Sequence, residues 1–261
     1  MATAAPPPAL FIAHGSPMLA LAGGAWGEAL AAEGTAGPRP TGLVVVSAHW
    51  ETPGGFRLTS AAVPGVMHDF GGFPAELYTL DYPAPGAPEL ARRAQALLTE
   101  AGLTADLDPR RPLDHGAWGP LRHLHPGADL PVVQLSLPLP RRPDLLRAAG
   151  RALAPLREQG VQLIASGGLV HNLRLLDWDR EDGPPRPWAQ AFQAWVDARL
   201  ASGDTRELDR WTEAPGARES VPTSEHLDPL FVVLGAAAGA AELLHRGWQL
   251  GSLSLASYRF P

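Results

Sequence analysis

The sequence contains no cysteine and no lysine, so all 21 of its basic residues are arginine. Without cysteine the chain cannot form disulfides, iron–sulfur clusters, cysteine-ligated zinc sites or thiolate nucleophiles. Without lysine it has neither a Schiff-base amine nor the lysine of a phosphate-binding P-loop. The side chains left for chemistry are those of His, Asp, Glu, Ser, Tyr and Arg, and the nine histidines are the first to consider.

Long apolar runs and a basic charge balance are also missing. No apolar run approaches the roughly 18 to 20 residues that cross a bilayer, and the N-terminus has no basic segment before an apolar one, so we expect no signal peptide and a cytoplasmic protein. The formal net charge of −6 and the pI near 5.8 give no basic surface for nucleic acid. We therefore expect a small-molecule partner, no nucleic acid and no membrane, while the oligomeric state is not indicated.

Short, continuously apolar segments recur along the chain and are typical of strands buried on both faces of a sheet. Between them, apolar residues recur with the spacing of helices that bury one face. The predicted strands cover residues 9–13, 43–50, 54–60, 131–137 and 161–165, with a late edge strand within 250–260. The predicted helices cover 19–34, 89–101, 143–156 and 188–200, and a further helix begins at 224.

This alternation predicts an α/β fold: a single domain with a central, mostly parallel sheet, helices on both faces, and the site at the C-terminal edge of the strands. No internal repeat or low-complexity linker divides the pattern. We expect a flexible arm over residues 1–8 and one domain over residues 9–261. Residues 109–126 and 177–187 are expected to lack regular structure, and His245 is expected in the last turn of a helix.

Three histidines, His14, His49 and His171, lie at or just beyond the ends of predicted strands, and His226 lies at a predicted helix start. The carboxyl ends of parallel strands meet at one crevice, so residues distant in sequence can converge there. One isolated histidine of this kind is more often a hydrogen-bonded structural residue. Three strands that repeat the pattern favour a shared site.

Neutral imidazole binds zinc, iron, copper and nickel, and three protein ligands with open coordination positions are a catalytic arrangement. The residues alone leave the choice of metal and of reaction open. Ser16 beside His14 resembles a nucleophile with its base, but the Gly-x-Ser-x-Gly turn is absent, which disfavours a serine hydrolase.

Six short motifs surround the histidines and follow one another along most of the chain: FIAHGSP (11–17), VVSAHW (45–50), HDFGGFP (68–74), LDHGAW (113–118), SGGLVHN (166–172) and EHLDPL (225–230). Each motif is weak by itself. The ordered set resembles the class III extradiol ring-cleavage dioxygenases of the DOPA-dioxygenase type, in the LigB-like superfamily. The resemblance implies an extradiol dioxygenase-like catalytic domain over residues 9–261.

The resemblance also implies a reaction: a nonheme metal-dependent enzyme opens the ring of a catechol-type aromatic diol with O₂ and gives a semialdehyde. It implies one divalent ion, with Fe(II) expected for activity and Zn(II) as another ion that can occupy the site. Relatives of the protocatechuate-cleaving type use a glutamate as the third ligand, so Glu225 beside His226 leaves that assignment open. The implied roles are metal ligands for His14, His49 and His226, an acid/base close enough to join them for His171, and a catalytic contact with substrate or its oxygen-derived intermediate for His115.

Two further residues are candidates for contact with the aromatic substrate. Trp118 either stacks on the substrate ring or packs in the core, and His68, in the long segment 61–88, either lines the pocket or lies at the surface. Asp114 has a comparable pair of readings, because it either orients His115 or caps a turn.

Two other functions stay open at this point. One is a metal-binding interaction protein like the Memo proteins, which resemble these dioxygenases in fold and would bind metal without oxygenase activity. The other is a zinc-dependent hydrolase, which would work without O₂. The motifs around His115 and His171 favour the enzyme, because a binding module needs no acid/base beside its metal.

Overall fold

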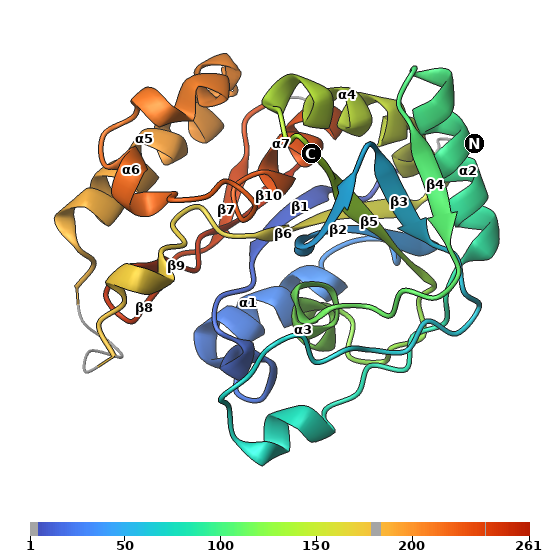
Figure 1. Cartoon of the computed structure of the whole chain (residues 1–261), viewed down its shortest axis with the longest axis horizontal. Coiled ribbons are helices and arrows are strands. Elements are labelled where there is room, and N and C mark those ends of the chain that lie inside the picture. The colour runs from blue at the N-terminus through green and yellow to red at the C-terminus, as the bar shows by residue number, and fades with distance from the viewer. Residues whose placement is uncertain (1–4, 179–183, 238) are drawn as a thin grey trace.

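The structure is a computed structural model that describes residues 5–178, 184–237 and 239–261, and within them eight strands form one sheet (Figure 1). From edge to edge the order is β4 (Ala105–Asp108), β3 (Phe56–Thr59), β5 (Val132–Leu139), β2 (Gly42–Pro53), β6 (Val161–Gly167), β1 (Ala9–Ala13), β10 (Ser257–Phe260) and β7 (Glu242–His245). Strands β5, β2, β6 and β1 are parallel, and so are β3 and β4. Strand β3 runs antiparallel to β5, and β10 runs antiparallel to both β1 and β7. The mostly parallel sheet is confirmed.

Both faces of the sheet are covered because successive side chains of its central strands enter two different cores. Phe11, Val44 and Leu163 belong to one core, whereas the residues that follow them, Ile12, Val45 and Ile164, belong to the other. Burial of these apolar side chains is the main favourable contribution to folding, at about 25 cal/mol per Å² removed from water. The first core includes residues of α2 (Pro88–Glu100), α4 (Pro143–Leu153), α5 (Pro187–Ser202) and α7 (Pro229–Ala236), and the second includes residues of α1 (Gly24–Thr35) and α3 (His115–Leu124).

Helix α7 packs against α4 at unusually short range, because glycines lie at the crossing. A Cβ atom added at Gly150 would lie 1.9 Å from the Val232 carbonyl oxygen, and one added at Gly235 would lie 2.1 Å from the Arg147 carbonyl oxygen. Neither position can therefore carry a side chain without moving a helix. This contact fixes α7, which begins three residues after His226.

Several elements differ from the sequence predictions. Residues 109–126 contain α3, which the sequence hides because Gly116, Gly119 and Pro120 are poor helix formers in its interior. Residue His245 lies in strand β7, where it pairs with Ser257 of β10, and not in a helix. The late strand β10 is internal, because β7 covers its outer side and forms the edge.

The predicted arm is only partly within the described residues, since residues 1–4 lie outside them. The Pro7 carbonyl accepts a hydrogen bond from Arg157 Nε at 3.1 Å, and the Pro8 carbonyl accepts one from Gln162 Nε2 at 3.2 Å. The end of the arm is thus fixed to the domain. Residues 179–183 of the predicted connector also lie outside the described residues, and none of the described helices is long and apolar enough to cross a membrane.

Candidate active site

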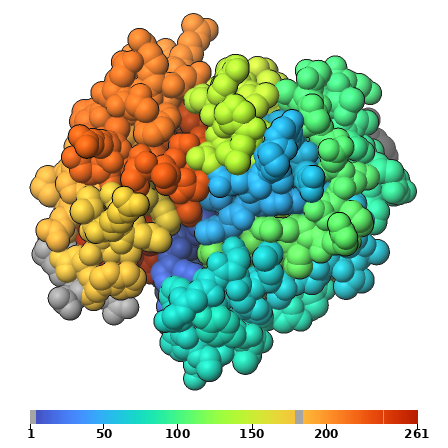
Figure 2. Space-filling view, in the orientation of Figure 1, coloured from blue at the N-terminus to red at the C-terminus, as the bar shows by residue number. Residues whose placement is uncertain are grey.

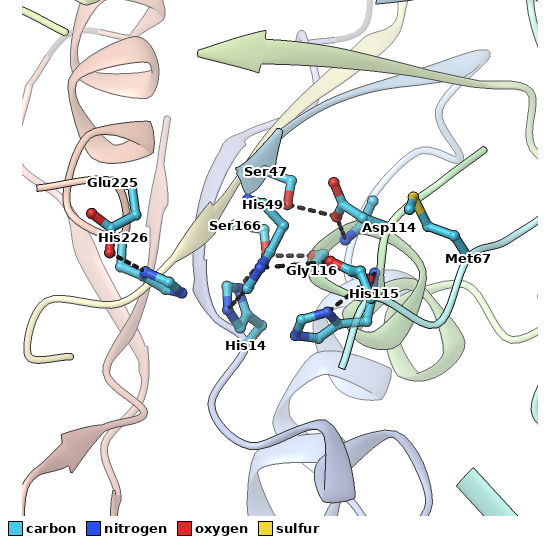
Figure 3. Close-up of polar contacts among 12 residues, drawn as sticks. His14, Ser47, His49, Met67, Asp114, His115, Gly116, Ser166, Glu225 and His226 are labelled. Atoms are coloured by element: carbon cyan, nitrogen blue, oxygen red, sulfur yellow. Dashed lines mark hydrogen bonds and ion pairs between the residues drawn. The ribbon is translucent and has the colours of Figure 1, made fainter. Parts of the chain in front are cut away.

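Five histidines from separate segments meet at the carboxyl edge of the central strands. In Figure 3 the rings of His14, His49, His115 and His226 point toward a common space, and neighbouring ring centroids are 4.1 to 5.6 Å apart. The fifth ring, His171, stacks on His226 with centroids 3.4 Å apart and planes within 7°. The structure therefore brings together all the histidines that the sequence analysis assigned to a metal or to catalysis, whereas His68, a candidate substrate contact, is not part of this cluster.

His49 owes its direction to a bulge in β2. Pairing with β5 runs until Val46 lies opposite Leu135 and resumes only at Glu51 opposite Leu137, so residues 47–50 face a single residue of the partner strand. Bulges bend a strand, redirect its side chains and are frequent beside active sites. Strand β2 therefore does not end at His49, as the sequence predicted, but continues to Pro53 after turning this imidazole toward the other histidines.

Helix α3 begins directly against this bulge. Asp114 caps the helix by accepting a hydrogen bond from the Ala117 backbone N–H at 3.2 Å, and it accepts another from Ser47 Oγ at 2.7 Å. A Cβ atom added at Gly116 would lie 2.5 Å from Ser47 Oγ and 2.9 Å from His49 Cδ2. The close approach therefore requires glycine at position 116. Of the two readings of Asp114, the structure confirms the cap.

The carboxylate that contacts His115 is Asp69, which the sequence analysis did not single out. Its Oδ1 accepts hydrogen bonds from the His115 backbone N–H at 2.9 Å and from His115 Nδ1 at 3.0 Å, and its Oδ2 lies 3.6 Å from His49 Nδ1. Burial acts to raise the pKa of Asp69, but the hydrogen bond and the charge of His115 outweigh it and lower that pKa to about 2. The side chain is an anion at neutral pH, and its position beside His68 in the motif was the only available signal.

Hydrogen bonds at His14 determine which of its nitrogens carries the proton. Ser166 Oγ donates its hydrogen to the Gly116 carbonyl, so it accepts at 2.9 Å from His14 Nδ1. The lone pair of His14 is then on Nε2, which lies 3.1 Å from His49 Nε2. With a hydrogen on His49 Nε2 these two atoms form a hydrogen bond, whereas two bare nitrogens at this separation repel each other unless a cation is bound between them.

His226 lies in the turn before α7, against the end of β6, and not within the helix itself. The Gly168 backbone N–H donates to the His226 carbonyl at 2.8 Å, and a Cβ atom added at Gly167 would lie 2.1 Å from that oxygen. These glycines admit the backbone of the turn that carries His226. His226 Nδ1 lies 3.2 Å from Glu225 Oε1, whereas its buried Nε2 has no hydrogen-bond partner among the described residues.

Four of these imidazoles, those of His14, His49, His171 and His226, are neutral at pH 7, because burial lowers their pKa values and neighbouring histidines lower them further. The pKa of His49 and that of His171 fall to about 4, and those of His14 and His226 lie well below the usual value. Neutral imidazole is the form that binds a metal. Facing lone pairs, a buried nitrogen without a partner and the nitrogen-rich donor set all fit a divalent transition metal. Among the described residues, two groups of three have potential ligand atoms within 4.8 Å of one another. One group is His14, His49 and His115, and the other is His171, Glu225 and His226.

A cavity of about 440 Å³ opens over these histidines. In the space-filling view it is the hollow between the teal loop that follows β3 and the yellow segment that follows β6, with the blue N-terminal region at its base (Figure 2). Cavities of this size accept small organic ligands, and these walls are mostly apolar. The wall residues include Phe70 and Phe73 on one side and Leu173, Leu176, Trp178, Leu250 and Leu253 on the other.

Trp118 and His68, the two candidates for contact with the aromatic substrate, both lie behind the wall of the cavity. Trp118 is fully buried and its Nε1 donates to the Met67 carbonyl at 2.9 Å, while His68 Nε2 lies 3.0 Å from the Leu80 carbonyl. Neither is among the described residues that line the large cavity. Both pack against Phe70, which does line it and which the sequence analysis missed. Because Trp118 Nε1 and His68 Nε2 both contact backbone carbonyls, these two side chains support that wall of the cavity.

Comparison with known proteins identifies relatives over nearly the whole chain. The profile of the family described as "Catalytic LigB subunit of aromatic ring-opening dioxygenase" matches residues 8–261. The chain is 42% identical over 255 residues to the 4,5-DOPA dioxygenase extradiol of Escherichia coli (strain K12), covering 96% of this chain and 93% of that protein. It is 38% identical over 267 residues to the protein of the same name from Beta vulgaris, covering 96% and 95%. The crystal structure of an uncharacterized protein from Escherichia coli K12 matches with a TM-score of 0.83 at 36% identity, covering 97% of this chain and 99% of that one.

The close approach of α3 to β2 predicts different effects for two glycine-to-alanine substitutions in the same helix. Gly116→Ala should lower the free energy of unfolding by about 1 to 3 kcal/mol, because Ser47 and His49 must move. Gly119→Ala is the control, since its Cβ would meet nothing nearer than 3.8 Å and alanine favours helix. Urea denaturation measures both, and equal stability of the two variants would contradict the steric argument.

The lowered imidazole pKa values predict that the metal-free protein loses stability in mild acid. The unfolded chain's histidines titrate near 6.5, whereas His49 and His171 in the folded chain titrate at about 4. Between these values the unfolded state binds more protons, so a falling pH favours unfolding by up to about 1.4 kcal/mol per pH unit for each imidazole. Burial raises the pKa of Asp228 to about 6 and also raises that of Glu33, and both oppose this effect, but the histidines with lowered pKa values outnumber them. Urea denaturation should give a free energy of unfolding that is constant above about pH 7 and falls below about pH 6.5. A flat profile would contradict neutral imidazoles.

Proposed function

The chain belongs to the LigB family of aromatic ring-opening dioxygenases and is an extradiol dioxygenase, and from this premise we propose that it cleaves catechol-type diols to semialdehydes. The observation that carries the proposal is the convergence of five imidazoles below an apolar cavity of about 440 Å³. Two relatives are named 4,5-DOPA dioxygenase extradiol, so a DOPA-like catechol is the first substrate to test. Because the chain belongs to the dioxygenase family, this function is favoured over a Memo-type interaction protein and over a zinc-dependent hydrolase.

We assign the metal to His14, His49 and His226. The Nδ1 atoms of His14 and His226 face a serine hydroxyl and a carboxylate, which leaves their Nε2 atoms free to bind an ion. Glu225 is less suited, because its Oε1 contacts His226 and its Oε2 lies 3.8 Å from Arg141. A nonheme Fe(II) bound there would supply the redox chemistry that O₂ activation needs, whereas Zn(II) accepts the same nitrogen ligands but has no redox chemistry.

His171 is proposed as the acid/base. Its ring lies flat on His226 and lines the cavity, and its backbone N–H donates to the Ser220 carbonyl at 2.9 Å. Burial is the main cause that lowers its pKa to about 4, and the neighbouring His49 adds to the effect, so the His171 ring is unprotonated at neutral pH. A diol oxygen that gains negative charge beside it would raise that pKa again and help it retain the proton. Transfer of this kind typically contributes ~10² to 10⁴ in rate.

His115 is proposed to contact the substrate directly. It lines the cavity, and its ring centroid is 4.1 Å from that of His49. Since Asp69 accepts from its Nδ1, its Nε2 carries a lone pair that can accept a hydrogen bond from a diol hydroxyl. Phe70, which meets the His115 ring edge to face at 5.4 Å, and Phe73 supply apolar surface for the aromatic ring.

Reconstitution provides the test of the activity. Metal-free protein loaded anaerobically with Fe(II), then mixed with DOPA or simple catechols and exposed to air, should consume O₂ and form a yellow ring-fission semialdehyde. Protein loaded with Zn(II) should do neither and is the matched control. Absence of turnover over a broad panel of catechols, with iron shown to be bound, would contradict the proposed substrate class.

The assigned roles predict a split between metal content and turnover. His49→Ala should lose bound metal, whereas His171→Ala should keep most of its metal and lose turnover by ~10² or more. His245→Ala, on the edge strand β7, is the control and should change neither. Metal analysis and O₂ uptake measure the two properties, and equal metal loss in the first two variants would place His171 among the ligands.

A further inference from the structure

We propose that Asp69 is a positioning residue that fixes the proton-bearing nitrogen of both His49 and His115, so that the Nε2 atoms of both remain bare. The proposal rests on the proposed function for what those Nε2 atoms bind, namely a metal ion and a diol. The positioning itself is a property of the metal-free protein and can be measured without activity.

The two oxygens of Asp69 act on the two rings in different ways. Oδ1 accepts two hydrogen bonds from His115, one from its backbone N–H and one from its ring Nδ1, at 2.9 and 3.0 Å. Oδ2 lies 3.6 Å from His49 Nδ1, which is too long for a hydrogen bond, so it acts on His49 through its charge. A carboxylate beside Nδ1 favours the ring form with its hydrogen on that atom and its lone pair on Nε2.

The loop that carries Asp69 is fixed to the start of α3, so the carboxylate cannot move independently of His115. Backbone hydrogen bonds join Met67 N–H to the Leu113 carbonyl at 2.8 Å and Leu113 N–H to the Gly65 carbonyl at 3.0 Å. The Trp118 indole N–H adds a third bond, to the Met67 carbonyl. The segment that leads to Asp69 is thus hydrogen-bonded to both the N–H and the carbonyl of Leu113, and Leu113 lies two residues before His115.

This arrangement makes asparagine at position 69 an asymmetric probe. An asparagine can keep its carbonyl oxygen toward the two donors of His115, because the opposite orientation would bring its NH₂ against both of them. Its NH₂ group then faces His49 Nδ1, where the carboxylate charge was. Asp69→Asn should consequently leave the His115 ring form unchanged and shift His49 toward the form with hydrogen on Nε2. Asp69→Ala should release both rings.

The experiment uses the full chain treated with chelator at about pH 7.5, with nitrogen-15 in its histidines. Two-bond proton–nitrogen NMR spectra report which ring nitrogen is protonated, and competition with a chromophoric chelator gives the affinity for Zn(II). In Asp69→Asn the His49 signals should change to the Nε2–H pattern with those of His115 unchanged, and Zn(II) affinity should fall about 10-fold. Asp69→Ala should change both sets of signals, with a loss of affinity toward about 100-fold.

Asp81→Asn is the matched control, because Asp81 belongs to the same long loop and, among the described residues, its exposed carboxylate accepts only from the Tyr82 backbone N–H, at 2.8 Å. It should leave both ring forms and the Zn(II) affinity unchanged. An Asp69→Asn variant with the wild-type His49 ring form and Zn(II) affinity would overturn the proposal, as would an equal loss in Asp81→Asn. A wild-type protein with the expected ring forms and metal affinity that cleaves no catechol would contradict the proposed function alone and leave this inference standing.

Discussion

The site depends on one constraint: several neutral imidazoles must keep their bare nitrogens facing one another in a buried space. Left alone, such rings would rotate or exchange protons to form hydrogen bonds between themselves. In four of the rings a polar group of the protein lies against the other nitrogen, which opposes such rearrangements. Ser166 accepts from His14, Glu225 lies against the Nδ1 of His226, and Asp69 serves His115 and His49. A metal ion then finds lone pairs whose directions are already set, which is how partners behind the ligands usually raise metal affinity.

Holding the rings this close requires backbone segments to approach one another without intervening side chains. Gly116 lets the first turn of α3 meet the bulge that carries His49, and Gly167 lets the turn that carries His226 meet the end of β6. The two contacts converge on Ser166, whose hydroxyl donates to the Gly116 carbonyl while accepting from His14. One hydroxyl at the end of the central strand thus links α3 to a ring that follows β1. A displacement of α3 or of β6 would therefore move the imidazole nitrogens that we assign to the metal.

Much of this could be predicted from the sequence, and the limits have physical causes. Buried strands are continuous apolar runs, so the sheet and the histidines at its strand ends could be located locally, and the fold class followed. Helix α3 could not, because Gly116, Gly119 and Pro120 argue against a helix that is stabilised by its cap and by burial. Asp69 was missed because its role arises from pairing between a loop and residue 113, a contact without a local pattern. For Trp118 the sequence left substrate stacking and core packing both open, because the loop whose Met67 carbonyl accepts from its buried indole N–H is distant in sequence.

The two parts of the site have different structural origins, and this separates the reaction from the choice of substrate. The imidazoles belong to the bulge of β2, to the segments that follow β1 and β6, to the start of α3 and to the turn that the packed helix α7 fixes. The cavity walls belong to loops: Phe70 and Phe73 come from one, and Trp178 follows β6 in another. Within the described part of the chain, most of these wall residues make no hydrogen bond to the imidazoles or to the residues that fix them. Loops tolerate changes that rigid elements do not, so side chains at the mouth can vary in size and charge while the metal-binding nitrogens stay in place. The exception is the loop of Asp69, where the residue beside Phe70 also sets two of the rings, so a change in that wall acts on the chemistry as well as on the fit of the substrate.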